Sequence, residues 1–249
     1  MNHVGAGGRK IFAVIPAYNE EDSVGPVVAG LKGLVDGVVV VDDHSADGTA
    51  AAGAAAGAVI VRNVRNLGVG GAIKAGYAEA ARRGADVMMV VAGDGQHDPR
   101  DLPSLIEPIA TGRADYVMGN RLFSEASSEG MPVLRFAGNR LLTAATRLIT
   151  GLDFKDSQCG YTALTCSAWR KMDSRFITDR WGFPNDVLVE CALRGLRVVS
   201  VNVRCIYNSG TSHIFLPSYS VRLAAILARG SLRLIGHRIK LGWSMKTDS

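Results

Sequence analysis

The feature of this sequence that most limits its fold is an alternation of short apolar runs with helix-length segments over the first 120 residues. The runs are rich in valine, isoleucine and methionine, and we expect them to be strands: residues 11–15, 38–41, 59–61, 87–91 and 116–118. They show no alternation of apolar and polar residues, which indicates a sheet covered on both faces. Helices are expected in between, at residues 20–35, 49–56, 70–83 and 101–111. This order predicts βαβ units and a mostly parallel sheet flanked by helices, which is an α/β fold.

The rest of the chain is less regular. Further elements are expected as helices at residues 133–150 and 184–194, a strand at 198–203 and a basic helix over most of 219–241. A chain of 249 residues has room for one such domain with an ample core. We therefore predict an α/β domain over residues 1–215 and a basic, amphipathic helical segment over residues 216–249.

Charge and cysteine usage narrow the partners and the compartment. The formal charge of +5 and the isoelectric point near 9.2 favour anionic partners. The basic residues come with no recognised nucleic-acid module, so we expect no nucleic acid. Four isolated cysteines indicate reduced thiols in the cytoplasm and not a zinc site or disulfide framework. No stretch reaches the roughly 18 apolar residues that span a bilayer, so any membrane contact is expected to be peripheral, on the cytoplasmic face.

Polar clusters follow four of the expected strands: PAYNEE, DDHSADG, GDGQHD and GNR. In parallel sheets, ligands bind beyond the carboxyl ends of the strands, so these clusters are expected to form one site. In sequence and order they resemble family 2 glycosyltransferases of the GT-A fold, the Rossmann-like nucleotide-diphospho-sugar transferases. VVVVDDHSADGT is similar to the family's VVDDGSxDGT, with His44 at the usual glycine, and RNVRNLGVGGAIKAGYAEA and GDGQHDP also match. The resemblance covers roughly residues 10–215.

The resemblance implies a donor site. It places four residues at the base and ribose of the nucleotide sugar, with Glu20 and Asp43 as the direct contacts: Pro16, Tyr18, Glu20 and Asp43. The alternative is that Asp42, Asp43 and Asp47 form a polar turn that caps the next helix. A second alternative concerns the glycines Gly68, Gly70 and Gly71. They lack the spacing of a phosphate-binding loop, so close backbone packing is favoured for them.

The resemblance also implies a metal site at Asp94 and Gln96, where Mg²⁺ or Mn²⁺ would stabilise a diphosphate leaving group. Relatives have two aspartates here, but this chain has Ala92 at the first position. We therefore expect the donor phosphates and water to complete the coordination. Asp98 is expected to cap the helix after Pro99.

Later motifs resemble the dolichol-phosphate mannose synthase branch, which attaches a sugar to a polyprenyl phosphate: GNR, DSQCGYTAL and GFPNDVLVECALRGLRVVSVNV. By this resemblance Arg121 and Arg135 hold the acceptor phosphate, and Asn139 shares a helix face with Arg135. Relatives often carry a Ser-Lys pair whose lysine meets the donor diphosphate. His213 stands at the lysine position here, which implies a weaker or pH-sensitive contact.

Three functions are consistent with these residues. In the leading one, the resemblance makes Asp94, Arg121 and Arg135 the catalytic groups of a hexosyl or N-acetylhexosaminyl transfer from a UDP- or GDP-sugar to a polyprenyl phosphate. A soluble hydroxyl or polysaccharide acceptor would require a base, for which Asp156 and Asp186 are the candidates. A nucleotide-sugar binding protein without catalysis is the third, motivated by Ala92 and His213.

A membrane surface is the expected location. The helical period places four basic residues on one stripe beside leucines, which is typical of a helix in an anionic interface: Arg222, Arg229, Arg233 and Lys240. The alternative is a core-packing helix with solvated arginines. A membrane-protein partner or a homo-oligomer is also consistent with exposed apolar faces.

Overall fold

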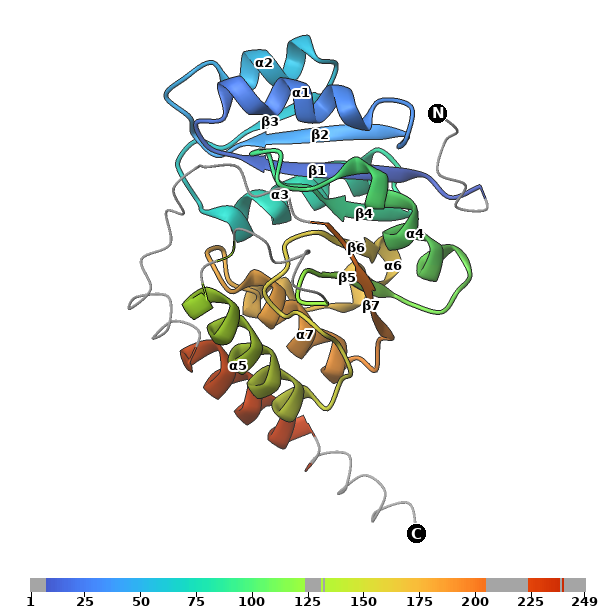
Figure 1. Ribbon diagram of the computed structural model, residues 1–249, viewed down its shortest axis with the longest axis vertical. Helices are drawn as coiled ribbons and strands as arrows, with labels where there is room; N and C mark the ends of the chain where they lie inside the picture. The colour runs from blue at the N-terminus through green and yellow to red at the C-terminus, as the bar shows by residue number, and fades with distance from the viewer. Residues whose placement is uncertain (1–7, 124–130, 132, 205–223, 238, 240–249) are drawn as a thin grey trace.

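The computed structural model describes residues 8–123, 131, 133–204, 224–237 and 239 (Figure 1). Its centre is one seven-stranded sheet in the order β3-β2-β1-β4-β6-β5-β7. The strands are β1 (Ile11–Ala17), β2 (Gly37–Asp42), β3 (Val59–Arg62), β4 (Val87–Val90), β5 (Tyr116–Asn120), β6 (Thr162–Thr165) and β7 (Val198–Asn202). Only β6 runs antiparallel to its neighbours, so the predicted α/β fold with a mostly parallel sheet is confirmed.

Helices cover both faces of the sheet. They are α1 (Glu21–Leu31), α2 (Thr49–Ala55), α3 (Val69–Arg82), α4 (Leu102–Ala110), α5 (Val133–Thr150), α6 (Cys166–Lys171) and α7 (Phe183–Leu193). Alternate residues of β1 enter two separate cores. Ile11 and Ile15 pack with α1 and α4, whereas Val14 packs with α3 and α7. Because both faces of β1 are covered, all of its residues 11–15 are apolar.

A second helical layer surrounds α7. The helix over residues 224–237, here called the C-terminal helix, packs on it: a Cβ at Gly230 would lie 2.8 Å from Val189. Helix α5 also contacts α7, and Figure 1 shows both helices at the end of the molecule opposite α1 and α2. Within the described residues, no helix has the length and apolar character to cross a bilayer. The three described cysteines are buried free thiols: Cys159, Cys166 and Cys191.

Candidate active site

The loops after β1 and β2 interlock at the carboxyl edge of the sheet. The amide of Asn19 donates to Oγ of Ser45 at 3.0 Å, and the amide of Glu20 donates to Oγ1 of Thr49 at 2.8 Å. His44 has a φ of +69°, which fits a position where the family motif has glycine. The two polar clusters therefore form one connected surface beside the loop that follows β4.

Asp43 joins this surface to α3. Its Oδ1 accepts from the side-chain amide of Asn63 and from the backbone of Leu67, and its Oδ2 accepts from the amide of Gly68 at 2.7 Å. The carboxylate thus occupies the positive amino end of α3, the place where a phosphate would otherwise bind. Among the described residues, Oδ2 accepts this one hydrogen bond, whereas Oδ1 accepts two.

The neighbouring acidic residues act as turn and cap groups. Oδ1 of Asp42 accepts from the amide of Ser45, and Asp47 accepts from the amide and hydroxyl of Thr49. The hydroxyl of Thr49 holds the pKa of Asp47 below its usual value. Asp42 therefore holds the turn, and Asp47 binds the first amide of α2, as the alternative of a polar turn before that helix describes.

The remaining predicted nucleoside contacts differ in exposure. Pro16 lies near the end of β1, and Tyr18 is half exposed just beyond that strand. The carboxylate of Glu20 accepts from Oγ of Ser23 at 2.6 Å, at the start of α1. The aromatic ring of Tyr18 is thus available to a ligand, while Glu20 is held by the protein.

The glycines before and within α3 serve close packing. A Cβ on Gly70 would lie 2.2 Å from the carbonyl oxygen of Thr178, and one on Gly71 would lie 2.6 Å from Cβ of Leu67. Gly68 has a φ of +92°. This agrees with the predicted packing role and not with a phosphate cradle.

Asp94 follows β4, as the metal prediction requires. Its Oδ1 accepts from the amide of Gln96 at 3.0 Å, and among the described residues no side chain bonds to Oδ2. Likewise, the described residues include no group of three or more His, Cys, Asp or Glu able to hold a metal. Two oxygen donors fit a hard cation whose other ligands come from phosphate and water. Asp98 caps the 3₁₀ turn at Pro99–Asp101, as predicted.

His97 shapes this loop, and the motif analysis gave it no role. Its Nδ1 accepts from the amide of Ala92 at 3.0 Å, and its ring stacks on Tyr161 with 4.3 Å between centroids. Burial, followed by the charge of Arg121, lowers the pKa of His97 to about 3, so the ring is neutral at neutral pH. A neutral ring can accept the Ala92 amide, which fixes the backbone just before Asp94. The place of His97 within GDGQHDP is the sequence signal that could have identified it.

Arg121 lies at the end of β5, where the acceptor phosphate is predicted. Its Nε lies 2.8 Å from Oδ2 of Asp156, and its Nη2 lies 3.2 Å from Oδ1. Asp156 is fully buried and also accepts from the amide of Gln158. The carboxylate therefore orients the guanidinium group and has both oxygens occupied.

The other predicted phosphate contacts are placed less fully. Asn139 is buried in α5, and its amide nitrogen lies 3.8 Å from the sulfur of Met131. Arg135 belongs to the first turn of α5, and the position of its side chain is not described. His213 lies outside the described residues.

Two arginines of the C-terminal helix bind buried carboxylates of α7. Nη2 of Arg229 lies 2.8 Å from Oδ1 of Asp186, and Arg233 pairs with Glu190. Burial raises the pKa of Asp186, against the opposing effect of Arg229. The predicted membrane-facing stripe is therefore wrong for Arg233, whose side chain is 19% exposed, whereas Arg229 pairs with Asp186 but stays 45% exposed. The other two members of the stripe lie outside the described residues: Arg222 and Lys240.

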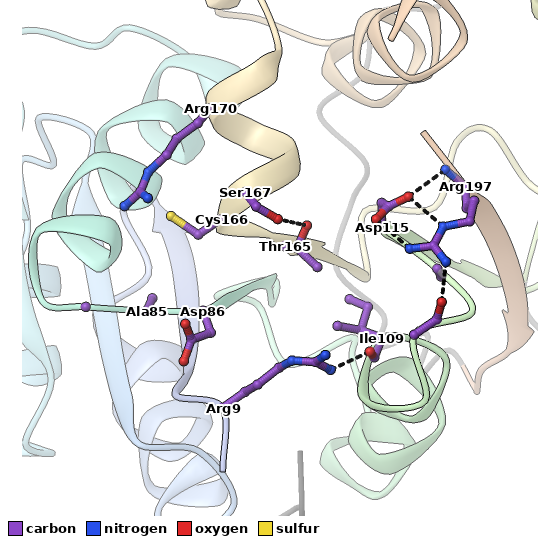
Figure 2. A pocket seen from close by; sticks show the side chains of 13 residues that line it. Arg9, Ala85, Asp86, Ile109, Asp115, Thr165, Cys166, Ser167, Arg170 and Arg197 are labelled. Carbon is purple, nitrogen blue, oxygen red and sulfur yellow. Dashed lines mark hydrogen bonds and ion pairs between the residues drawn. The ribbon is translucent and has the colours of Figure 1, made fainter. Parts of the chain in front are cut away.

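A cavity of about 470 Å³ lies at the opposite edge of the sheet, where β1, β4 and β5 begin. Figure 2 shows Arg9 reaching the carbonyl of Ile109 and Arg197 bound to Asp115. The cavity is separate from the strand ends that carry the predicted site.

A mostly parallel α/β sheet with acidic loops at its carboxyl edge is the arrangement of a GT-A glycosyltransferase. The model of the Glycosyl transferase family 2 matches residues 12–198, and the protein belongs to this family. The resemblance drawn from the motifs is thereby confirmed.

Named relatives and a solved structure agree with this assignment. The chain is 29% identical to a UDP-N-acetylglucosamine–dolichyl-phosphate N-acetylglucosaminyltransferase from Methanococcus voltae, with 92% of each chain covered. It is 32% identical to an undecaprenyl-phosphate mannosyltransferase from Micrococcus luteus, over 78% of this chain and 82% of that relative. Glucosyl-3-phosphoglycerate synthase from Mycobacterium tuberculosis, solved with Mn²⁺, UDP-glucose and phosphoglyceric acid, matches with a TM-score of 0.69. It is 24% identical over 92% of this chain and 81% of that chain, which shows a shared fold.

Proposed function

We propose that this glycosyltransferase moves a hexose or an N-acetylhexosamine from a UDP- or GDP-sugar to a polyprenyl phosphate, with inversion at the anomeric carbon. The observation that carries the proposal concerns the two candidate bases. Asp156 is bound to Arg121, Asp186 is bound to Arg229, and both carboxylates are buried. Each of their four carboxylate oxygens accepts a hydrogen bond from another described residue, whereas a hydroxyl acceptor would need a free carboxylate oxygen as its base.

A phosphate acceptor removes the need for a base. A phosphate monoester has a second pKa near ~6 and is mostly dianionic at neutral pH. It needs only to be held in line with the anomeric carbon. Arg121, Arg135 and Asn139 would hold it while its oxygen forms the new bond and the bond to the nucleoside diphosphate breaks. The named relatives that act on polyprenyl phosphates support this acceptor.

The donor would lie along the ends of β1, β2 and β4. Four residues would contact its base and ribose: Pro16, Tyr18, Glu20 and Asp43. Asp94 and Gln96 would hold Mg²⁺ or Mn²⁺, whose charge stabilises the leaving diphosphate. His213 would add a further contact to the diphosphate. The Mn²⁺ and UDP-glucose bound in the structural neighbour support a divalent metal for this fold.

The acceptor's lipid tail implies a membrane surface, and we infer peripheral binding on the cytoplasmic face. Five large apolar side chains of α5, of the C-terminal helix and of residue 239 just beyond it are each at least 53% exposed: Leu141, Leu148, Leu232, Ile235 and Ile239. Exposed leucine and isoleucine on a helix bury their apolar area when the helix enters a lipid interface. A membrane-protein partner or a second copy of the chain would cover the same residues. In this proposal residues 1–215 form the glycosyltransferase domain, and the segment of residues 216–249 contributes to the membrane-binding surface.

Transfer from radiolabelled UDP- and GDP-sugars to short-chain polyprenyl phosphate, with and without Mn²⁺ or Mg²⁺, tests the proposal. We expect a metal-dependent product that extracts into organic solvent. Asp94→Asn should lower the rate by at least about 100-fold, because the metal contributes several kcal/mol to the leaving group. Its melting temperature should stay unchanged, since the asparagine oxygen can still accept from the amide of Gln96, the one bond that Asp94 makes among the described residues.

The same assay separates the alternatives. Phosphoglyceric acid, the acceptor ligand of the structural neighbour, serves as a soluble acceptor with a hydroxyl. If labelled product formed only with phosphoglyceric acid, the acceptor would be a soluble hydroxyl compound and not a polyprenyl phosphate. Nucleotide binding without transfer to either acceptor would indicate a binding protein, and full activity of Asp94→Asn would refute the metal site.

A further inference from the structure

A loop over residues 178–182 packs against the beginning of α3. The amide of Gly71 donates to the carbonyl of Asp179 at 2.8 Å, and Lys74 donates to Oδ1 of Asp179 at 2.8 Å. Gly70 has no Cβ, and this absence lets the carbonyl of Thr178 approach its backbone. The loop and α3 therefore share one fixed interface.

The same end of α3 holds Asp43. The amide of Gly68 donates to Oδ2 of Asp43, and Cγ of Arg180 would lie 3.2 Å from a Cβ on Gly68. Only one residue separates Gly68 from Gly70. A shift of the 178–182 loop would therefore move the backbone amides that hold the Asp43 carboxylate.

The other side of the loop is held by α7 and the C-terminal helix. Oδ2 of Asp186 accepts from the amide of Thr178 at 2.8 Å. Nη2 of Arg229 lies 2.8 and 2.9 Å from the two oxygens of Asp186 and also donates to the carbonyl of Phe176 at 3.1 Å. A Cβ on Gly182 would collide with Ile226 at 2.4 Å, so the two helices meet closely there.

We propose that Arg229 is a positioning residue of the donor site. By fixing Asp186 and the 178–182 loop, it sets the amino end of α3 and with it the carboxylate of Asp43. The C-terminal helix is then a working part of the nucleotide site as well as a candidate membrane element. The inference rests on the proposed function in one respect: Asp43 must contact the donor nucleotide.

The chain provides a matched control in Arg233, one turn further along the same helix. Arg233 also pairs with a buried carboxylate of α7, that of Glu190. Glu190, however, accepts from the amide of Asp173 and not from the 178–182 loop. Arg229→Ala and Arg233→Ala therefore remove similar ion pairs, but of the two arginines Arg229 is the one hydrogen-bonded to Asp186, which holds the 178–182 loop.

The experiment is titration calorimetry of UDP and GDP with Mn²⁺ on the whole chain, without lipid. Arg229→Ala should raise the Kd of the nucleotide that binds by about five- to thirtyfold, whereas Arg233→Ala should leave it near wild type. Both variants should lose thermal stability. Hydrogen exchange at the amide of Thr178 should accelerate in Arg229→Ala alone.

Each other outcome has a distinct meaning. Equal Kd values for the two alanine variants would overturn the positioning role, because loss of an ion pair would then be the whole effect. Should Arg229→Ala fail to fold, Arg229→Lys and Arg233→Lys give the same comparison, with the higher Kd expected for Arg229→Lys. If the wild-type chain bound neither nucleotide, the proposed function itself would fail.

Discussion

At the scale of single residues, the charged groups of this site are held by partners inside the protein. Asp43 binds the backbone amides of Leu67 and Gly68, Asp156 binds Arg121, and the neutral ring of His97 binds the amide of Ala92. Buried polar groups need such partners to offset lost hydration. The consequence is that these groups are oriented before any ligand arrives.

Asp156 offers a test of this orientation. Asp156→Asn would leave the buried Arg121 without its counter-charge, and breaking a buried ion pair costs about 3–5 kcal/mol. We expect the free energy of unfolding, measured by urea denaturation, to fall by about that amount. Transfer activity should fall too, because the guanidinium group loses its fixed direction.

A double variant separates this effect from base catalysis. Arg121→Met with Asp156→Leu removes both charges, and apolar replacement of a buried pair is often neutral for stability. The double variant should regain most of the lost stability and stay inactive. A single Asp156→Asn variant that is inactive but as stable as wild type would instead indicate that Asp156 is the base.

At the scale of elements, the start of α3 depends on the absence of side chains. Gly70→Ala would place a methyl group 2.2 Å from the carbonyl oxygen of Thr178. Overpacking of this kind costs about 1–3 kcal/mol. We expect a lower melting temperature and a weaker affinity for the nucleoside diphosphate, measured by differential scanning fluorimetry with and without UDP or GDP.

Gly25 is the matched control for that substitution. It lies inside α1 just before Pro26, and apart from that neighbour a new Cβ would have an ordinary contact of 3.7 Å with the carbonyl oxygen of Ala52. Replacing it with alanine should change the free energy of unfolding by less than about 1 kcal/mol, because the better helix propensity of alanine opposes its contact with the proline ring. A Gly70→Ala variant as stable as wild type would contradict the close packing of α3 on the 178–182 loop.

The elements of the first half were predictable because their signals are local. Continuous apolar runs identify strands buried on both faces, and five of the seven strands were placed from them, while β7 was predicted separately at residues 198–203. The missed strand, β6, has the sequence Thr-Ala-Leu-Thr, which carries no long apolar run. Its assignment depends on pairing with β4 and β5, far away along the chain.

The candidate site was predictable to a similar degree. The motifs identified the loops at the strand ends, and the structure brings those loops together. They did not identify the partners of the charged groups, such as Asp186 for Arg229. Helical periodicity assigns a residue to a face of its helix, but it does not tell which other element covers that face. For that reason two arginines expected at a membrane are instead bound to α7.

At the scale of the whole molecule, the C-terminal helix has two different faces. Arg229 and Arg233 bind α7, and Ile226 and Leu234 are buried. The exposed side of the helix carries Leu232 and Ile235, with Ile239 just beyond its described end, beside the exposed Arg229 and His237. The membrane prediction therefore moves from the charges of this helix to its leucine and isoleucine side chains.

Replacing Leu232, Ile235 and Ile239 together by serine tests this reassignment. Fully burying one such side chain contributes about 1.5–3 kcal/mol, so losing three should weaken binding to phosphatidylglycerol vesicles by more than about tenfold. Sedimentation with vesicles measures the binding, and an unchanged melting temperature shows that the fold is intact.

Val64→Ser is the control, because Val64 is 92% exposed on the loop between β3 and α3, and its loss should leave binding unchanged. If the triple variant sediments like wild type, the C-terminal helix does not enter the membrane. Equal losses in both variants would mean that binding follows overall surface hydrophobicity and not this helix.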